Sequence, residues 1–358
     1  MLELEELQEG KKVKLGFYPY TYVRTIVMKS LLFRESDYHK MVKMSFSEIA
    51  KLLQESHYRK EINSLATEHS GADLLELALN RSLAESFKKL IMISPNELGL
   101  LIREYARRKD IEDIKTILRG RFTKADESLI INSITGAGTL SRDFLLSLLK
   151  KDSVEEILKS IKMLRPSILK KLLKDLNEKR SLVGVENTLD SFYYSRLIKF
   201  AESLPKEGDL MKNFITREVE ILNILTLLRL KKANFSKKDI KDFIILSGNK
   251  AKDSKINSLI DIDLDNISKA LSKTEYKNVV SKSIEEYKKT GSLINLETEL
   301  YKHLLKQSIL LLHQHILSID VMLSYMFAKD IEVRNLKIIV KGKQLGLSEE
   351  FIESQLIY

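Results

Sequence analysis

A pattern of twelve residues occurs three times along this chain of 358 residues, at nearly equal intervals. The copies read DIEDIKTILRGR from residue 110, EILNILTLLRLK from residue 220 and EVRNLKIIVKGK from residue 332, so they lie 110 and 112 residues apart. Each copy begins with an acid, carries Asp or Asn at its fourth position, and has Arg or Lys at its tenth and twelfth positions. An internal repeat constrains the fold more than any single motif, because each copy must fold in a similar way.

Two weaker patterns share the same period. One is an isoleucine, followed in two copies by a tyrosine nine residues later, and the other is a hydrophobic residue next to an acid. Their members are Ile49, Ile157 and Ile267, then Tyr58 and Tyr276 (with Pro166 in the second copy), and Leu75-Glu76, Leu189-Asp190 and Leu296-Glu297. Three patterns in the same order, three times over, predict a threefold repeat of about 110 residues.

The twelve-residue motif has the periodicity of a helix. At 100° per residue its second, fifth and ninth positions fall within an arc of about 60°, whereas the tenth-position base lies on another face. We therefore expect each copy to turn an apolar stripe inward and a cation away from it. Elsewhere, capping residues predict helices of roughly 10–20 residues that begin near Ser47, Asp73, Ser94-Pro95 and Ser348.

Composition agrees with a helical chain. Only 13 Gly and 4 Pro occur, which is few for the turns of an all-β fold, and the 44% hydrophobic residues allow a sizeable core. A unit of about 110 residues is too long for a solenoid repeat. We expect an all-α protein with a tail at 1–16 and three similar helical domains at 17–118, 119–228 and 229–358. Near-equal copies favour a pseudo-threefold, funnel-like arrangement with a central cavity.

The sequence contains no recognisable catalytic or cofactor site. It has no phosphate-binding loop of the G-x-x-x-x-G-K-[ST] type, and GAGTLS at 136–141 is best explained as a turn of small residues. His303, His313 and His315 form no metal site, because residues 313 and 315 point about 160° apart on a helix. Cysteine is absent, and no Ser-His-acid set has a familiar context. We expect no enzyme activity, no cofactor and no metal.

The chain also lacks the signals of a membrane protein. Its longest apolar stretch, Leu304–Phe327, contains Lys306, Asp320 and several other polar residues, so it is unsuited to crossing a bilayer. The N-terminus, MLELEELQEGKKVKLG, is acidic and then basic, unlike a signal peptide.

The net charge of +10 is compatible with an acidic partner. The candidate contact residues are the tenth- and twelfth-position cations, Arg119, Arg121, Arg229, Lys231, Lys341 and Lys343. Basic residues near the C-terminal end of a helix are also favoured by the helix dipole, so a purely structural role is the alternative. Nucleic acid is not expected as a partner, because no basic segment is interleaved with aromatic residues.

Taken together, these segments resemble the C subunit of archaeal A-type and related V-type rotary ATPases, whose eukaryotic relative is the d subunit of the V-ATPase. The resemblance is carried by LSIDVMLSYMFAKDIEVRNLKIIVKGKQLGLSEEFI (317–352), YPYTYVR (18–24), FSEIAKLLQESHYRKEI, ARRKDIEDIKTILRGR and EVEILNILTLLRLK, and it covers about 17–358. The histidines before Leu317 and the loss of a tyrosine at Pro166 depart from the pattern.

The resemblance implies a non-catalytic central-stalk subunit of an A/V-type ATP synthase or ATPase. Such a subunit is a socket and spacer that links the central shaft to the proteolipid rotor ring and transmits torque. It would lie on the cytoplasmic face of the cell membrane as a peripheral protein, with the shaft subunits and the ring as partners and no small-molecule substrate of its own. The alternative is a helical-repeat scaffold or adaptor unrelated to a rotary motor, which would be an elongated superhelix and not a compact funnel.

Overall fold

The computed structural model describes residues 18–179, 182–204, 206–246, 250–263, 266–271, 274–290, 292, 294–314 and 317–358. The expected tail at 1–16 lies outside these ranges. Within them the regular elements are α-helices and there is no β-strand, which confirms the all-α prediction. Nor does any helix of this part of the chain have the length and apolarity needed to cross a membrane.

The helices fall into six long ones and several short ones. The long ones are α6 (Gly71–Met92), α7 (Asn96–Thr123), α12 (Leu182–Glu202), α13 (Lys206–Lys232), α18 (Ile294–Gln314) and α19 (Ile319–Gln344). The short ones are α2 (Pro19–Ser30), α3 (Glu35–Lys43), α4 (Phe46–Glu55), α5 (Arg59–Leu65), α8 (Glu127–Ser133), α9 (Arg142–Leu149), α10 (Val154–Ser160), α11 (Pro166–Lys179), α14 (Lys237–Phe243), α15 (Lys250–Ile260), α16 (Ile267–Ala270), α17 (Lys277–Thr290) and α20 (Glu349–Ser354).

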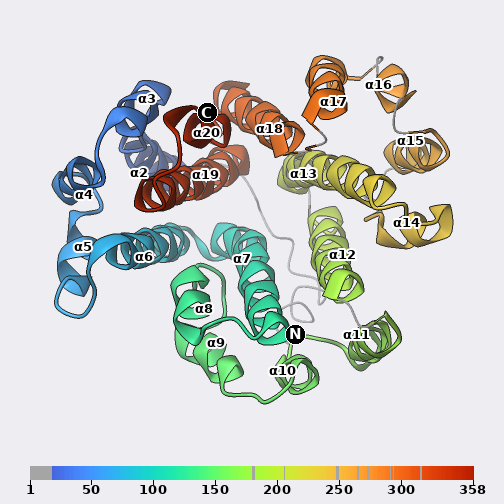
Figure 1. The fold of residues 1–358 in the computed structure, drawn as a ribbon, viewed down its shortest axis with the longest axis horizontal. Coiled ribbons are helices and arrows are strands. Elements are labelled where there is room, and N and C mark those ends of the chain that lie inside the picture. Colours follow the sequence, from blue (N-terminus) through green and yellow to red (C-terminus); the bar gives the residue numbers. More distant parts are fainter. Residues whose placement is uncertain are drawn as a thin grey trace.

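The six long helices form a closed ring in the order α6, α7, α12, α13, α18, α19 (Figure 1). Each packs against the next, and α19 closes the ring by packing against α6. The short helices lie outside it in three groups, α8–α11, α14–α17, and α20 with α2–α5. The third group therefore combines both ends of the chain. Because the ring closes, the chain is not an extended superhelix.

The repeated motif lies on α7, α13 and α19, which are three of the six helices that form the ring. All nine residues of the predicted stripe are at most 4% exposed: Ile111, Ile114, Leu118, Ile221, Ile224, Leu228, Val333, Leu336 and Val340. The anchor residues Ile49, Ile157 and Ile267 are fully buried as well. These helices have 28, 27 and 26 residues, longer than the predicted 10–20. Other helices pack against these three on several sides. Their apolar residues therefore extend along each helix beyond the twelve-residue motif.

The fourth motif position makes the same contact in every copy. Asn223 donates to the carbonyl of Ile245 and accepts from its N–H, both at 2.8 Å. Asn335 does the same with Ile357, at 2.6 and 3.0 Å. Asp113, as a carboxylate, only accepts, and it takes the N–H of Thr135 at 2.8 Å. Each partner lies 22 residues further along the chain, so the same backbone turn is held against each motif helix.

The motif helices also end alike. The residue after the last turn has a left-handed backbone in each: Lys124 (φ 55°), Asn234 (φ 56°) and Gly346 (φ 66°). The next N–H then bonds back to a carbonyl five residues earlier, Ala125 to Gly120, Phe235 to Leu230 and Leu347 to Gly342, at 2.9–3.0 Å. This is the Schellman arrangement, which satisfies carbonyls left open at a helix end.

Two of the predicted helix starts need correction. Ser348 caps α20 as predicted, and α7 follows Ser94-Pro95 directly. However, Ser45 and not Ser47 caps α4, through a capping box with Glu48, and α6 begins after Ser70, ahead of Asp73. In both cases an earlier serine takes the cap position, and the residue predicted to cap lies in the first turn of the helix.

The GAGTLS segment is a loop, as predicted, and its role is structural. Asp110 accepts the N–H groups of Thr139 and Leu140 at 2.8–2.9 Å and the hydroxyl of Thr139 at 2.7 Å. A side chain at Gly138 would meet this carboxylate, since a Cβ there would lie 2.0 Å from Asp110 Oδ1. The small residues therefore allow the loop to lie directly against α7.

Candidate partner-binding site

Each tenth-position cation pairs with a glutamate on the neighbouring long helix. Arg119 Nε lies 2.6 Å from Glu186 Oε1 on α12, and Lys341 Nζ lies 3.0 Å from Glu76 Oε2 on α6. Arg229 pairs in the same way with Glu297 on α18. One ion pair of the same kind therefore joins each motif helix to another long helix: α7 to α12, α13 to α18, and α19 to α6.

These pairs correct one of the sequence anchors. Leu189-Asp190 was expected to be the counterpart of Leu75-Glu76 and Leu296-Glu297. The ion pairs show instead that Glu186, one helical turn earlier, is the equivalent acid. Asp190 bonds to Lys115 at 2.7 Å. Both acids lie on the same face of α12, but Glu186 also fits the repeat period better, since it lies 110 residues after Glu76 and 111 before Glu297.

The twelfth-position cations bond to the ends of short helices that follow in the chain. Arg121 donates to the carbonyl of Leu149, and Lys231 donates to Ile260 and Ile262 at 2.7 and 2.6 Å. Lys343 reaches Glu349 at 3.4 Å. Basic residues near a helix C-terminus commonly bond to carbonyls in this way.

The tenth-position cations remain accessible although they are paired. The side chains of Arg119, Arg229 and Lys341 are 57%, 56% and 40% exposed. Arginine carries five N–H donors and lysine three, so one carboxylate leaves donors that can face a second acceptor. The geometry allows a ring of half-exposed cations, each oriented by its own glutamate.

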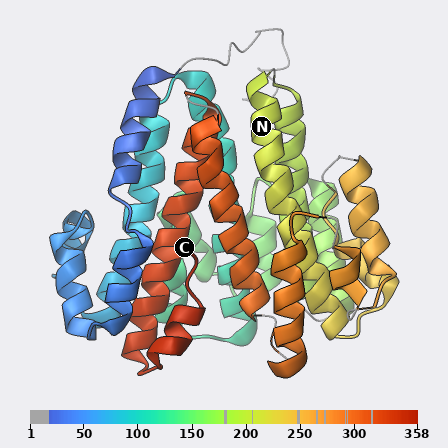
Figure 2. The same cartoon turned by 90° about the horizontal axis from the view of Figure 1, so that it is seen from above.

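Exposed apolar side chains accompany the cations where α7, α13 and α19 end. They are Phe122, Leu129, Phe235, Leu345, Leu347 and Phe351, between 38% and 66% exposed. We call the three segments 121–129, 231–239 and 343–351 the turn end of the molecule. In Figure 2 the turn between α19 and α20 lies at the lower edge, opposite the N-terminal end of α2. Clusters of exposed apolar residues bordered by charge are typical of protein interfaces.

The structure also shows a central charge cluster that the sequence did not lead us to expect. Arg108 of α7 pairs with Glu218 of α13 and, at 2.7 Å, with Asp330 of α19. Lys109 lies 2.5 Å from both Asp330 and Glu112. Burial raises the pKa of Glu218, against the opposing effect of Arg108. The cluster joins all three motif helices in the middle of the ring.

A signal for this cluster was present in the sequence. Arg108, Glu218 and Asp330 each lie two residues before the start of their copy of the motif. The three positions carry one cation and two acids, so they share no residue type and did not appear as a repeat. Only the meeting of the three helices shows that the differences are complementary.

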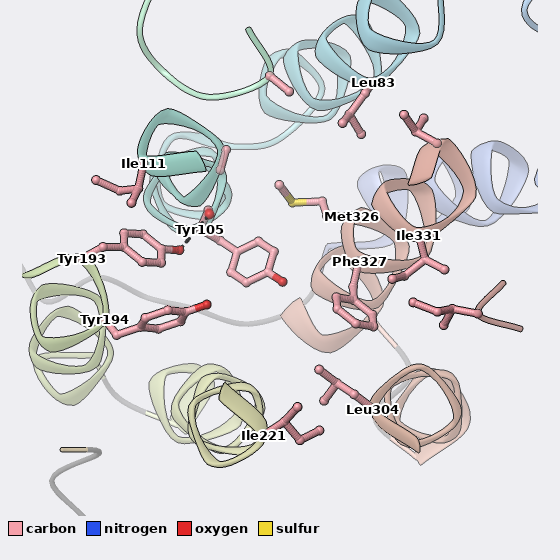
Figure 3. Packing of buried hydrophobic residues seen from close by; sticks show 14 of the residues in the cluster. Leu83, Tyr105, Ile111, Tyr193, Tyr194, Ile221, Leu304, Met326, Phe327 and Ile331 are labelled. Carbon is pink, nitrogen blue, oxygen red and sulfur yellow. Dashed lines mark hydrogen bonds between the residues drawn. The ribbon is translucent and has the colours of Figure 1, made fainter. Parts of the chain in front are cut away.

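Aromatic rings pack beside these charges. The ring centroids of Tyr105 and Phe214 are 5.8 Å apart, and those of Phe214 and Phe327 are 6.2 Å apart. Arg108 lies over the rings of Tyr105 and Phe327, at 5.1 and 5.9 Å. Figure 3 shows Tyr105 and Phe327 facing each other across the middle, with Tyr193 donating to the Tyr105 carbonyl at 2.9 Å. At this level side chains fill the middle of the ring.

The histidines do not assemble with other ligands in the described residues. His303 lies 3.6 Å from Glu275, and its ring packs against Tyr276. The side chain of His313 and the whole of His315 lie outside what the structure describes. No group of three or more His, Asp or Glu in the described residues is arranged to hold a metal ion.

The fold and these contacts define an all-helical protein whose repeated surface features suit binding to another protein. Comparison with known sequences identifies the family. The family model described as "ATP synthase (C/AC39) subunit" matches residues 22–355. The chain belongs to this family.

Relatives match along nearly the whole chain. A protein from Methanococcoides burtonii, named as the C subunit of an A-type ATP synthase, is 38% identical over 342 residues, which covers 95% of this chain and 94% of the relative. The proteins of the same name from Methanosarcina barkeri and Halobacterium salinarum are 34% and 31% identical, and they cover 98% and 95% of this chain. The resemblance found from the sequence motifs is confirmed.

Proposed function

We propose that this chain is a non-catalytic central-stalk subunit of an A/V-type ATP synthase or ATPase. It would be a socket and spacer between the rotor shaft of the soluble head and the proteolipid ring in the membrane, and it would transmit torque during ion-coupled ATP synthesis or hydrolysis. Membership of the family over residues 22–355 carries this proposal, because the matching relatives are named as subunits of an ATP synthase. The contacts of α7, α13 and α19 add a physical rationale.

We further propose the architecture predicted from the repeat, three similar domains in a pseudo-threefold funnel with a central cavity. The contacts at the fourth, tenth and terminal positions of each motif helix support it, since each recurs three times. Residues 118 and 228, the proposed domain boundaries, lie inside α7 and α13. Each of these helices would then contribute to two domains. The Arg108 cluster would form the floor of the funnel.

Torque transmission requires a stiff body, and the ring of long helices suits that role. Close-packed interiors transmit strain because their side chains have little free space. Arg108, Glu218 and Asp330 link three helices that are far apart in sequence, so twisting one against another would separate buried charges. Removing one partner of a buried pair costs about 3–5 kcal/mol, so contacts of this kind resist separation.

The proposed partners are the shaft subunits and the proteolipid ring. We place the chain on the cytoplasmic face of the cell membrane, as a peripheral part of the complex. Neither nucleic acid nor a small-molecule substrate enters this proposal, and no cofactor is needed for a mechanical role.

The proposed contact residues are Arg119, Arg121, Arg229, Lys231, Lys341 and Lys343. Arg119, Arg229 and Lys341 are the strongest candidates, because they combine exposure with a fixed orientation. Carboxylates on a shaft or on ring loops would complement them. Such charge complementarity steers association and orientation more than it raises affinity.

Charge reversal tests these three residues. The set Arg119→Glu, Arg229→Glu and Lys341→Glu should lower binding to the rest of the complex by about tenfold or more at low salt, with a smaller effect at high salt. Binding would be measured as recovery of shaft and ring subunits with the tagged full chain. Circular dichroism should show unchanged helicity.

A matched control separates docking from folding. Adding Glu186→Arg, Glu297→Arg and Glu76→Lys to the reversed set restores the three ion pairs of the tenth-position residues with their charges exchanged. It gives up one weaker contact, that of Glu297 with Arg334 at 3.7 Å. If the tenth-position cations bind a partner, the exchanged variant stays defective. Recovery of binding on exchange would show that the pairs only hold the long helices together, and it would remove these residues from the interface.

A further inference from the structure

Helix α2 has an exposed outer face that is mostly apolar. Tyr20, Val23, Val27 and Leu31 are 64%, 56%, 53% and 54% exposed. They are spaced three, four and four residues apart, so they form one stripe along the helix and its C-cap. At 1.5 Å per residue the stripe is about 16 Å long.

The inner face of α2 carries both hydroxyl and apolar side chains. This helix packs against α19, and its buried residues are Thr21, Thr25 and Met28. Tyr22 and Ile26 are partly buried and also pack against the core. Thr25 donates to the carbonyl of Thr21 at 2.7 Å, and Thr21 donates to the carbonyl of Ile93 at 3.0 Å. A surface helix normally turns its larger apolar residues toward the core. Helix α2 instead carries apolar residues on both faces, which is typical of a helix that is covered on both sides.

Helix α2 has no counterpart in the other two groups. In the described residues, four short helices (α8–α11) accompany α7 and four (α14–α17) accompany α13. Five short helices, α20 and α2–α5, accompany α19. Equivalent isoleucines show which short helices correspond. Helix α4 corresponds to α10 and α16 through Ile49, Ile157 and Ile267. Helix α20 corresponds to α8 and α14 through Ile352, Ile130 and Ile240. The additional helix is therefore α2. Its surface marks one side of an otherwise repetitive molecule.

The charged residues of α2 and its flanks up to residue 34 are all basic, and the first acid, Glu35, follows directly after them. Residues 18–34 contain Arg24, Lys29 and Arg34 and no acid. A partner helix packed along such a stripe would present its own apolar residues at helical spacing. Charges that flank the stripe select the partner, so acids on the partner helix would complement these cations.

We propose that the outer face of α2 is a docking surface for an α-helix of another subunit, whose apolar stripe is flanked by Asp or Glu. This rests on the proposed function, because it takes the partner to be a subunit of the same ATP synthase complex. It is separate from the turn end, since α2 starts at the opposite end of the molecule (Figure 2). Contact through one unrepeated helix would fix the rotational position of this subunit on its partner.

The test uses the chain assembled into the complex in its own membranes. The photoreactive amino acid p-benzoylphenylalanine replaces Val27, and the same probe at exposed Lys51 on α4 serves as the matched control. After irradiation the crosslinked peptides are identified by mass spectrometry. The expected product joins position 27 to a helical segment of another subunit with apolar residues three and four apart and acids beside them. Val23→Asp should greatly reduce this product, and Leu310→Asp, at an exposed leucine of α18, should not.

Several outcomes would overturn the proposal. They are adducts with lipid alone, with residues 1–17 of the same chain or with a second copy of it, and a yield no higher than at Lys51. In each of these the chain can still copurify with ATP synthase subunits, so the proposed function stands while the docking surface fails. A chain that does not assemble with those subunits overturns both.

Discussion

At the scale of single residues, the three copies of the motif hold an equivalent backbone turn with different side chains. Asn223 and Asn335 both donate to and accept from one backbone residue, whereas Asp113 can only accept. Burial raises the pKa of Asp113 to about 6, although the N–H groups of Thr135 and Gly136 oppose this rise. Holding this carboxylate ionised therefore costs folding free energy at neutral pH.

Asp113→Asn should remove a pH dependence of stability. An acid whose folded pKa lies above its unfolded value of 3.8 binds more protons when folded, so its contribution to the unfolding free energy falls as pH rises from about 4 to 6. The asparagine variant should therefore gain about 1–3 kcal/mol relative to the natural chain across this range. Urea denaturation at pH 4, 5, 6 and 7 measures the unfolding free energy. Asn223→Asp should have the opposite effect, a stability relative to the natural chain that falls as the pH rises. An unchanged slope in both variants would contradict this account.

Arg108→Met should destabilise the fold strongly, because it leaves Glu218 and Asp330 without their shared cation. The expected loss is about 3–5 kcal/mol in chemical denaturation. In the double variant Arg108→Met with Glu218→Met the loss should be smaller, since one of the two stranded carboxylates is gone and Asp330 keeps Lys109. A double variant less stable than the single one would show that the cluster does not act as a unit.

At the scale of elements, the sequence predicted helices, the inward stripe and the repeat, but not helix lengths or all of the starts. The stripe follows from spacing that any helix must obey, so nine of nine positions are buried. Helix starts depend on which of several nearby serines takes the cap, as at Ser45 and Ser70. That choice depends on packing as well as on local preference. The helix ends were not predicted either, since lysine at position 124 does not favour a left-handed backbone as glycine at position 346 does.

Lys124→Gly should stabilise the first of these turns. A lysine at φ 55° carries a steric cost that glycine lacks, and glycine occupies the equivalent position at 346. The gain should be about 0.5–1 kcal/mol, after allowing for the greater freedom of glycine in the unfolded chain. Thermal denaturation measures it. Lys51→Gly, inside α4, should instead lose about 1 kcal/mol, and equal effects of the two glycines would contradict the role of the turn.

At the scale of the whole molecule, the N-terminal and C-terminal segments form one group. Glu332 on α19 accepts from the Tyr58 hydroxyl and from the Phe33 N–H, both at 2.6 Å, and Lys329 lies 2.9 Å from the same carboxylate. Burial raises the pKa of Glu332, but Lys329, His57 and Tyr58 outweigh it and hold the pKa at about 2. A buried, ionised network thus joins α19 to residues 274 and 299 positions earlier in the chain.

Such long-range pairings could not be predicted from the sequence alone. Periodicity tells which face of a helix is buried, but not which distant helix covers it. Arg108, Glu218 and Asp330 show this limit, since their shared register is visible in the sequence and their complementarity is not. The cations Arg119, Arg229 and Lys341 could be found because they repeat in type. Glu76 and Glu297 were also found as repeat anchors, but their pairing with these cations became clear only from the packing of the long helices.

The most direct test of the central claim is electron cryomicroscopy of the complex isolated from its native membranes through a tag on this chain. We expect one copy on the rotor axis, between the end of the shaft and the proteolipid ring, with the turn end in contact with one of them. A chain located at the periphery of the complex, away from the axis, would contradict the proposed function, as would an isolated complex that lacks shaft and ring subunits.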